Sequence, residues 1–436
     1  MIEQSGSGYQ GKPLILFANF HSDLAVDFGE SEVLAQWAQQ APREVWLLQA
    51  GDVLVSPVPL AEEFLEYAAN LTGVPAASLT VVEVPVAGGS AVPMADAVRQ
   101  AGLVGRLHDL AGEQSPPILP TALDRSVAEL ARELDVSVHP YATVSDAEAA
   151  LDVTTLLNTK DGFRQAAEHL RMRVPAGRTC HRAEVDGVVR ALLEGHERVV
   201  VKPDRSAGGH GLRFVSRGDD ECRTGADLKL DAVGGPTGMW VVEEFVDVAQ
   251  SVSVQLENTA EGTRVLFDGT METSQGSYTG YRSPLPRPCA HADELERWGT
   301  RLGRYLAERG YAGPLGFDAL VSKDGKLYAS ESNVRRTATT SPHAMVMRLT
   351  AVSPLLRPAW SVSRGRTRHP LPFREALDRV RDHRLAFDPA RGEGVVFYQG
   401  APPDARSWRY AVIAADLDGL SELDARLGEA LELEAA

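Results

Sequence analysis

The sequence predicts an α/β region with a parallel sheet, followed by an α+β region built on antiparallel strands. Up to about residue 142, apolar strand-like runs alternate with helical runs, which favours a doubly wound parallel sheet. From Arg198 onward short strands predominate and are separated mainly by turns. A chain of 436 residues is too long for one ordinary core, so we expect two or three domains.

Composition restricts the class of protein. Hydrophobic residues make up 44% of the chain and charged residues 24%, which is typical of a soluble globular protein. A formal net charge of -16 argues against a nucleic acid or an anionic membrane as the main partner. Neither a signal peptide nor an apolar run of about 18 residues occurs, so we expect a cytoplasmic protein outside the membrane. The sequence leaves the oligomeric state open and allows a homo-oligomer.

Cysteine usage gives no sign of a disulfide framework. Cys180, Cys222 and Cys289 are far apart and form no C-x-x-C pair. We therefore expect isolated thiols and no zinc cluster.

The first region is expected to span residues 1–144. Its predicted strands are 14–20, 44–50, 79–85, 118–122 and 136–141, and its predicted helices are 32–40, 61–71 and 94–111. Alternation of this kind places helices against a parallel sheet.

The second region, 145–358, is expected to be the catalytic body, with a smaller lid subdomain over about 180–246 and a main part over about 247–358. Its predicted strands are 199–203, 211–215, 239–246, 251–258 and 264–267, and a helix is predicted over 293–309. Residues 359–436 are expected to form a small C-terminal α/β module with helices over 373–387 and 420–433 and strands over 394–399 and 408–414. The basic run 364–369 could bind an anionic partner, but a solvated linker is favoured.

A hairpin near residue 325 is the most informative local feature. Strand-like runs flank Asp324-Gly325, a strong hairpin signal, and a two-residue loop pairs Ser322 with Leu327, Leu320 with Ala329 and Asp318 with Glu331. Opposed carboxylates, roughly 4.5–5.5 Å apart at Cβ, destabilise a hairpin unless something offsets their charge. A Mg²⁺ ion between them, with Asn333 adding a neutral oxygen, would do so. Hydrated carboxylates on a solvent-facing hairpin are the alternative.

A second group of residues is suited to phosphate. Lys202 ends an apolar strand and is followed by a small-residue turn that contains Ser206, Gly208, Gly209 and His210. Glycines let the main chain approach phosphate oxygens, and the lysine neutralises them as a point charge. A mobile hairpin loop with an incidental lysine is the alternative. The literal G-x-G-x-x-G at 6–11 precedes the first strand instead of following it, so it is predicted to be a flexible start.

Three further elements fit nucleotide chemistry. Lys160 is predicted to begin a helix, where a phosphate would meet free N–H groups. Residues 240–247 form an apolar strand that ends in acids and could lie against an adenine edge. Arg335 and Arg336 would supply positive charge where a carboxylate or phosphoryl group is attacked. The segment 269–287 is either a lid over an intermediate or a plain surface loop.

Over roughly residues 155–345 the sequence resembles the ATP-grasp superfamily of carboxylate-amine ligases. The resemblance is carried, in chain order, by Lys160, Lys202 with its glycine loop, Glu243-Glu244-Phe245-Val246, Asp318 and Glu331-Ser332-Asn333-Val334-Arg335. The resemblance implies an ATP-grasp fold behind an N-terminal pre-ATP-grasp domain. It implies that Lys160 and Lys202 bind the ATP phosphates and that the loop with Ser206, Gly208, Gly209 and His210 covers them. It also implies that residues 243–246 hold the adenine. It also implies Mg²⁺, with Mn²⁺ as a substitute, on Asp318, Glu331 and Asn333.

The resemblance also implies catalytic roles for three residues. Arg335, with Arg336 beside it, would stabilise charge on the phosphorylated acid, and Lys202 would assist phosphoryl transfer. Gln250 stands where many members hold the ribose with a glutamate. Gly316 stands where some members carry a catalytic arginine, so Arg335 would do that work.

A closer resemblance is to pheganomycin-type peptide ligases of natural-product biosynthesis. It is carried by the segment 14–23, the motif 331–337 and the overall length of the chain. That resemblance implies an ADP-forming ligase that joins an acid, such as a nonproteinogenic amino acid, to the amine of an amino acid or peptide. A ligase or carboxylase of primary metabolism and a non-catalytic ATP-binding regulator are the alternatives.

Overall fold

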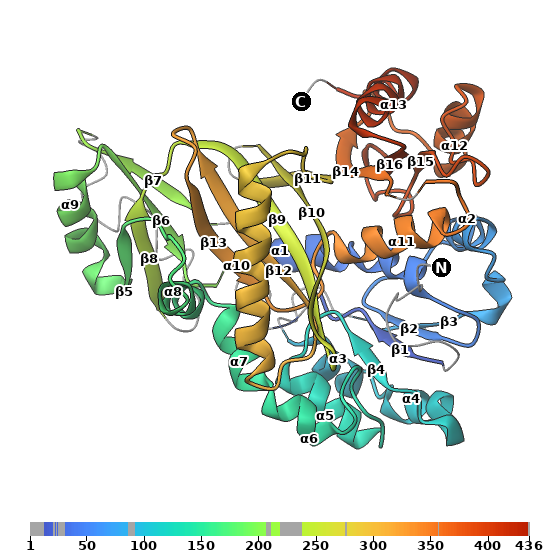
Figure 1. The fold of residues 1–436 in the computed structure, drawn as a ribbon. Helices are drawn as coiled ribbons and strands as arrows, with labels where there is room; N and C mark the ends of the chain where they lie inside the picture. The colour runs from blue at the N-terminus through green and yellow to red at the C-terminus, as the bar shows by residue number, and fades with distance from the viewer. Residues whose placement is uncertain are drawn as a thin grey trace.

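The computed structural model describes residues 13–20, 22, 24, 31–85, 92–205, 211–218, 238–274, 277–355 and 357–434. Within these residues the chain forms one parallel and two antiparallel sheets with helices packed against them (Figure 1). The predicted fold class, a parallel α/β region followed by antiparallel sheets, is confirmed.

The first sheet is parallel, with strand order β3-β2-β1-β4. Its strands are β1 (Ile15–Phe17), β2 (Val53–Ser56), β3 (Thr80–Glu83) and β4 (Ile118–Pro120). Its helices are α1 (Ser31–Ala38), α2 (Glu62–Thr72), α3 (Met94–Gln100), α4 (Val104–Ala111) and α5 (Arg125–Glu133), with 3-10 helices η1 (Ala41–Leu47), η2 (Ala76–Ser78) and η3 (Gly112–Gln114). Since β1 lies between β2 and β4, the loops after β1 and β4 meet at the sheet edge where such folds bind ligands.

Two strands predicted in this region are wrong. Residues 44–50 belong mainly to η1, where Pro42 in the first turn has a φ suited to a helix; the strand is β2 instead. Residues 136–141 form only an isolated bridge, between Val138 and Ile118. Pro140 lacks the N–H that a longer ladder needs.

The central sheet has the strand order β13-β12-β9-β10-β11-β14-β16-β15. Its strands are β9 (Val248–Thr259), β10 (Gly262–Ser274), β11 (Ser277–Ser283), β12 (Gly313–Ser322), β13 (Leu327–Asn333), β14 (Ala359–Arg366), β15 (Gly394–Val396) and β16 (Ser407–Ala414). Helix α10 (Ala290–Ala307) packs against β9 and β10, and α11 (Thr340–Thr350) packs against η1. Each consecutive strand pair is antiparallel.

The segment 269–287, predicted to be a lid or a surface loop, lies largely within this sheet. Thr270 pairs with Arg282 on β11, and Gly280 pairs with Ser363 on β14. Ladder hydrogen bonds on both sides hold these residues, so the expectation of a surface loop is wrong for 269–274 and 277–283. Residues 284–287 lie outside the strands, and a lid stays a prediction.

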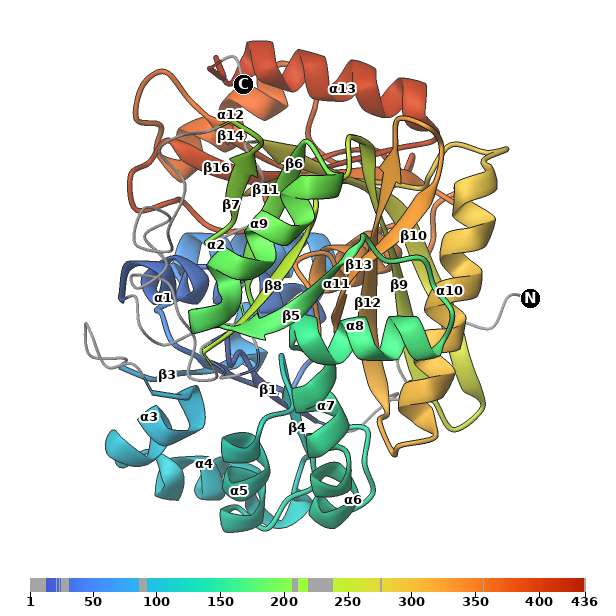
Figure 2. The ribbon, with the colours of Figure 1, turned by 90° about the vertical axis from the view of Figure 1, so that its left-hand side faces the viewer.

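A smaller antiparallel sheet has the order β5-β8-β6-β7, with β5 (Gly177–His181), β6 (Arg198–Pro203), β7 (Arg213–Ser216) and β8 (Met239–Glu244). The 3-10 helix η4 (Arg182–Glu184) leads into α9 (Val185–Gly195), which packs on one face of the sheet and closes a small core of its own (Figure 2). Helices α6 (Val144–Ala149), α7 (Leu151–Leu157) and α8 (Lys160–His169) connect the parallel sheet to this one.

The C-terminal residues extend the central sheet. Helices α12 (Phe373–Asp382) and α13 (Leu417–Ala430) accompany β14, β15 and β16, and β14 is hydrogen-bonded between β11 and β16. Arg364 and Arg366 therefore lie in a strand, and the prediction of a linker at 364–369 is wrong for them. The predicted domain boundaries at residues 144 and 358 stay a prediction. The central sheet contains strands on both sides of residue 358.

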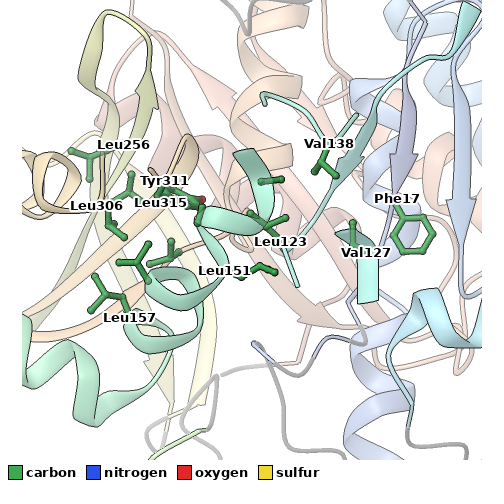
Figure 3. Close-up of a cluster of buried hydrophobic side chains, with 14 of the residues drawn as sticks. Phe17, Leu123, Val127, Val138, Leu151, Leu157, Leu256, Leu306, Tyr311 and Leu315 are labelled. Atoms are coloured by element: carbon green, nitrogen blue, oxygen red, sulfur yellow. The ribbon is translucent and has the colours of Figure 1, made fainter. Parts of the chain in front are cut away.

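Two large hydrophobic cores join the parts. One runs from the parallel sheet through α7 to the central sheet and includes Phe17, Leu157 and Leu315 (Figure 3). The other joins η1 and α2 to α11 and the C-terminal strands and includes Trp46, Met345 and Trp408. In the part of the chain that the structure describes, no helix is long and apolar enough to cross a membrane.

A buried ion pair also joins the first region to the end of β13. Arg336 pairs with Glu44 of η1, and Arg43 reaches the same carboxylate at 3.8 Å. All three side chains are almost fully buried. One carboxylate therefore serves two buried arginines.

We expect Glu44→Gln to destabilise the protein by about 3–5 kcal/mol, because it leaves two buried arginines without an acid. The matched control is Glu63→Gln, which removes an exposed partner of Arg374 and should cost less than about 1 kcal/mol. Thermal unfolding of both variants measures the difference. Equal changes in Tm would contradict the role given to Glu44.

Candidate functional site

The predicted hairpin forms, but with a different turn. Val321 pairs with Leu327 and Ala319 with Ala329, so the predicted pairs Ser322–Leu327 and Leu320–Ala329 are wrong. Ser322 N donates to Lys326 O at 2.9 Å, which leaves a loop of three residues, 323–325. Gly325, with φ of 82°, takes the left-handed position that a three-residue loop needs. A bulge at Ser330 then restores the predicted pair of Asp318 and Glu331.

The two carboxylates differ in environment. Asp318 is 7% exposed, whereas the Glu331 side chain is 33% exposed. Burial and the facing Glu331 raise the pKa of Asp318 to about 7. Asn333 Nδ2 donates to Asp318 Oδ2 at 3.0 Å, so the amide lies beside both acids as predicted.

This set of oxygens fits a Mg²⁺ ion. No cluster of three or more Asp, Glu, His or Cys side chains that could hold a metal occurs among the described residues, so the third donor here would be the Asn333 amide. Carboxylate and amide oxygens are hard ligands, and a dication between Asp318 and Glu331 would offset the burial and the repulsion that raise the pKa of Asp318.

Lys160 begins α8, as predicted. Thr159 caps this helix, accepting from Gly162 N at 3.0 Å, and the Lys160 N–H donates to Asp204 O at 3.0 Å. Lys160 Nζ lies 4.0 Å from Glu331 Oε2. Burial lowers the pKa of Lys160, because its charged form has lost water. The lysine and the metal-ligand candidates thus face one another.

Arg335 is held by a residue that the sequence analysis missed. Its Nη1 donates to Asn158 Oδ1 at 2.8 Å, and the same oxygen accepts from Val334 N at 3.1 Å. Asn158 Nδ2 donates to Thr154 O and Val334 O. Asn158 immediately precedes the Thr159-Lys160 pair, but its tie to Arg335 spans 177 residues and no local pattern reveals it.

These residues line one pocket, and Lys160 also lines a second. The first is lined by Leu24, Asn158, Thr159, Lys160, Glu331, Ser332, Asn333 and Arg335. The second is lined by Lys160, Phe163, Arg164, Val174, Pro175, Lys202, Val241, Glu243, Ala329 and Ser330. The structure therefore brings Lys160, Lys202, Glu243, Glu331, Asn333 and Arg335 to two adjoining cavities, with Asp318 paired to Glu331.

In the second pocket, Lys202 forms an ion pair with Glu243. Arg164 also approaches Glu243, with Nη1 3.5 Å from Oε2, and donates to the carbonyls of Pro175 and Gly177. Arg164 is another residue that the sequence analysis missed. Glu243 thus balances two cations inside the pocket.

The other predicted adenine-side residues lie outside both pockets. Glu244 accepts from Ala176 N at 2.8 Å, and the Phe245 ring packs 4.4 Å under the Arg198 guanidinium. Val246 follows as part of the connection to β9, and Gln250 donates to Thr270 Oγ1 at 2.7 Å. The backbone N–H of Glu244 already donates to Ala176 O at 2.7 Å and that of Phe245 to Arg198 O at 2.9 Å. Gln250 would have to exchange its partner to reach a ribose.

Arg336 does not reach the pocket. Adjacent residues of extended chain point to opposite sides, so Arg335 faces the pocket while Arg336 faces Glu44. A catalytic role for Arg336 is therefore not supported. Ser206, Gly208, Gly209 and His210 lie outside the described residues.

Gly316 is explained by close packing. A Cβ atom at this position would lie 2.8 Å from Gln255 Nε2 and 3.0 Å from Thr337 Cγ2. A side chain at this position would therefore have to displace the amide end of Gln255. Arg335 is the arginine that lines the first pocket.

Comparison with known proteins supports this fold. Residues 41–136 match the family described as the Pre ATP-grasp domain, and residues 375–427 match the PGM1 C-terminal domain. No curated protein sequence matches the chain.

Solved structures match nearly the whole chain at low identity. Biotin carboxylase from Campylobacter jejuni, in a β,γ-ATP complex, has a TM-score of 0.59 at 15% identity and covers 97% of this chain and 91% of its own. The biotin carboxylase domain of 2-oxoglutarate carboxylase from Hydrogenobacter thermophilus, a dimer with MgADP and bicarbonate, has a TM-score of 0.57 at 15% identity, with 98% and 91% covered. N5-carboxyaminoimidazole synthase from Aspergillus clavatus, with ADP and 5-aminoimidazole ribonucleotide, has a TM-score of 0.56 at 11% identity, with 97% and 99% covered. The chain shares the fold of these proteins.

The raised pKa of Asp318 predicts a pH-dependent stability. Because the folded protein binds this proton more tightly than the unfolded chain, the stability is full below the ordinary value of 3.8 and is lost as pH rises through about 7. We expect Tm of metal-free protein to fall across this window and Mg²⁺ to oppose the fall at the higher pH. Asp318→Asn should lose both effects. Calorimetry that finds the same pH slope in both proteins would contradict the assignment.

Proposed function

We propose that this protein is an ADP-forming carboxylate-amine ligase that uses Mg·ATP. The observation that carries the proposal is the placement of Glu331 and Asn333 at the end of β13, and of Arg335 two residues beyond it, in a pocket shared with Lys160. One cavity would therefore hold ligands for the metal, a cation that binds phosphate (Lys160) and a cation that holds the acid (Arg335). The shared fold with ATP- and ADP-bound proteins supports it.

The reaction would take place in two displacements. A carboxylate oxygen of the acid attacks the γ-phosphorus of ATP, and the bond from that phosphorus to the β,γ-bridging oxygen breaks to release ADP. The amine nitrogen then bonds to the acyl carbon, the bond from that carbon to the phosphate oxygen breaks, and the amine loses a proton. Mg²⁺ bound at Asp318 and Glu331 would neutralise phosphate charge during the transfer.

The residues of the two pockets would divide this work. Lys160 and Lys202 would hold the phosphates, with Lys202 exchanging Glu243 for the nucleotide. Arg335, fixed by Asn158, would hold the acid and stabilise the oxyanion that forms when the amine attacks. Because Asn158 also binds the backbone of Val334, Arg335 is oriented before substrate arrives.

The finer part of the proposal concerns the substrates. The resemblance to pheganomycin-type ligases supports an amino acid, such as a nonproteinogenic one, as the acid and an amino acid or peptide as the amine, in natural-product biosynthesis. One observation favours a second candidate, a carboxylase: a structure that shares this fold holds MgADP together with bicarbonate. In that reaction bicarbonate would take the place of the acid at Arg335.

ADP release over a matrix of acids and amines, with hydroxylamine as a trap, tests the proposal. We expect a particular acid to release ADP with hydroxylamine and to form its hydroxamate, because hydroxylamine captures an acyl phosphate. ADP release that depends on bicarbonate alone would favour the carboxylase. Absence of both would leave an ATP-binding regulator and overturn the ligase proposal.

We expect Glu331→Gln to lower the turnover at least about 100-fold and to weaken Mg·ATP binding, because a charged ligand of the metal is lost. Asp324→Asn is the matched control: it removes an acid from the same hairpin, at the exposed turn, where Asp324 pairs with Lys326. Steady-state ADP release and Mg·ATP titration check both. Turnover of Glu331→Gln equal to that of the control would remove the hairpin from the metal site.

A further inference from the structure

Lys160 and Lys202, the two candidate ligands for phosphate, come from different parts of the fold. Lys160 begins α8, which packs against β13 of the central sheet and β8 of the smaller sheet (Figure 2). Lys202 lies on β6 of the smaller sheet. Both side chains nevertheless line the second pocket. Because two like charges in one cavity repel each other, contacts outside the pocket have to hold the lysines together.

Asp204 provides such contacts. It follows Lys202 by two residues, and its N–H donates to Met239 O at 3.2 Å, which continues the pairing of β6 with β8. Its carbonyl accepts from Lys160 N at 3.0 Å, and its Oδ1 accepts from Asp161 N at 2.9 Å. Asp204 is 4% exposed. The end of β6 is therefore bound directly to the first turn of α8.

These bonds occupy the beginning of α8. Gly162 N donates to Thr159 Oγ1, so the N–H groups of residues 160–162 all have acceptors within the protein. The expectation that a phosphate would meet free N–H groups at Lys160 is therefore wrong, and the side chain of Lys160 is what a phosphate would contact. The positive end of the helix dipole instead favours the carboxylate of Asp204.

Further bonds fix the rotation of α8 against the smaller sheet. Thr179 Oγ1 of β5 donates to Asp161 Oδ1 at 2.7 Å. One turn further along the helix, Arg164 Nη2 donates to the carbonyls of Pro175 and Gly177, each at 2.9 Å. Residues four apart lie on the same face of a helix, and Lys160 and Arg164 both line the second pocket. Rotation of α8 would break these bonds and move Lys160 out of place.

The residues just before α8 are bound to the segment that carries the metal-ligand candidates. Asn158 Oδ1 accepts from Val334 N at 3.1 Å, and Ser332 Oγ donates to Leu157 O at 2.5 Å. The start of α8 is thus held between this segment on one side and the end of β6 on the other. Asp204 supplies the contact on the β6 side.

We propose that Asp204 is a positioning residue for nucleotide binding, although its own side chain lines neither of the two pockets. By binding the first turn of α8 to the end of β6, it keeps Lys160 and Lys202 at a fixed separation, so that the phosphates of one ATP contact both. The proposal rests on the proposed function, which assigns phosphates to these lysines. Because the lysines are placed before ATP arrives, binding does not have to bring two like charges together.

Asp204→Ala tests this role, because it removes the Oδ1 acceptor and keeps the backbone carbonyl. We expect it to raise the Kd for Mg·ATP, measured by titration, about 10-fold. Asp204→Asn should stay within about 2-fold of the wild type, because asparagine caps a helix nearly as well as aspartate. The matched control is Asp416→Ala, which removes the aspartate cap of α13, where Oδ1 accepts from Gly419 N at 2.8 Å. Its Kd should equal that of the wild type.

A second measurement separates positioning from a general loss of stability. In a Lys160→Met background, Asp204→Ala should raise the Kd for Mg·ATP less than about 2-fold, because the lysine through which it acts is absent. The full 10-fold rise in that background would overturn the proposal. If Asp204→Ala does not fold, Thr179→Val takes its place, since it loosens Asp161 and leaves Asp204 intact. An unchanged Kd in Thr179→Val would then overturn the proposal.

The outcomes also separate Asp204 from the proposed function. If Asp204→Ala and Asp416→Ala have the same Kd while the wild type forms a hydroxamate, the role of Asp204 fails and the ligase proposal stands. If the wild type binds Mg·ATP but forms no hydroxamate, the ligase proposal fails and the Kd values still decide the role of Asp204. A wild type that binds no Mg·ATP would overturn both.

Discussion

The alternation of side chains along residues 331–336 is the constraint on which the site depends. Glu331, Asn333 and Arg335 line the first pocket, whereas the residues between them are fixed to the protein interior. Ser332 Oγ donates to Leu157 O at 2.5 Å, Val334 is buried in the core, and Arg336 pairs with Glu44. Because Asn333 and Arg335 each stand between two anchored neighbours and Glu331 precedes one, this segment cannot rotate or slip without breaking buried contacts.

The N-terminal region contributes to this constraint through η1. Glu44 pairs with Arg336 just beyond β13, and Trp46 of the same 3-10 helix donates to Tyr398 O just beyond β15. One short element thus contacts both the segment after β13 and the segment after β15. Its burial between the parallel and central sheets explains why a helix with Pro42 and Trp46 occupies a segment whose apolar pattern favours a strand.

Charge within the two pockets is balanced before any nucleotide arrives. Glu243 neutralises Lys202 and approaches Arg164, and Glu331 lies 4.0 Å from Lys160. Nucleotide phosphates and a dication carry the same two signs of charge and could replace these partners one for one. The buried charge at η1 is different, since Arg43 and Arg336 share the single carboxylate of Glu44.

The sequence by itself determined the chemistry of the hairpin and the alternation of elements, because both depend on spacing along the chain. The pair of Asp318 and Glu331 is an example, although the three-residue turn and the bulge at Ser330 that produce it cannot be read from an Asp-Gly signal. Only the tertiary structure decided that Asn158 orients Arg335, that Arg336 belongs to Glu44, and that residues 269–274 and 277–283 are sheet instead of a loop. Each of these depends on contacts between residues distant in sequence, whose burial and partners no local pattern contains.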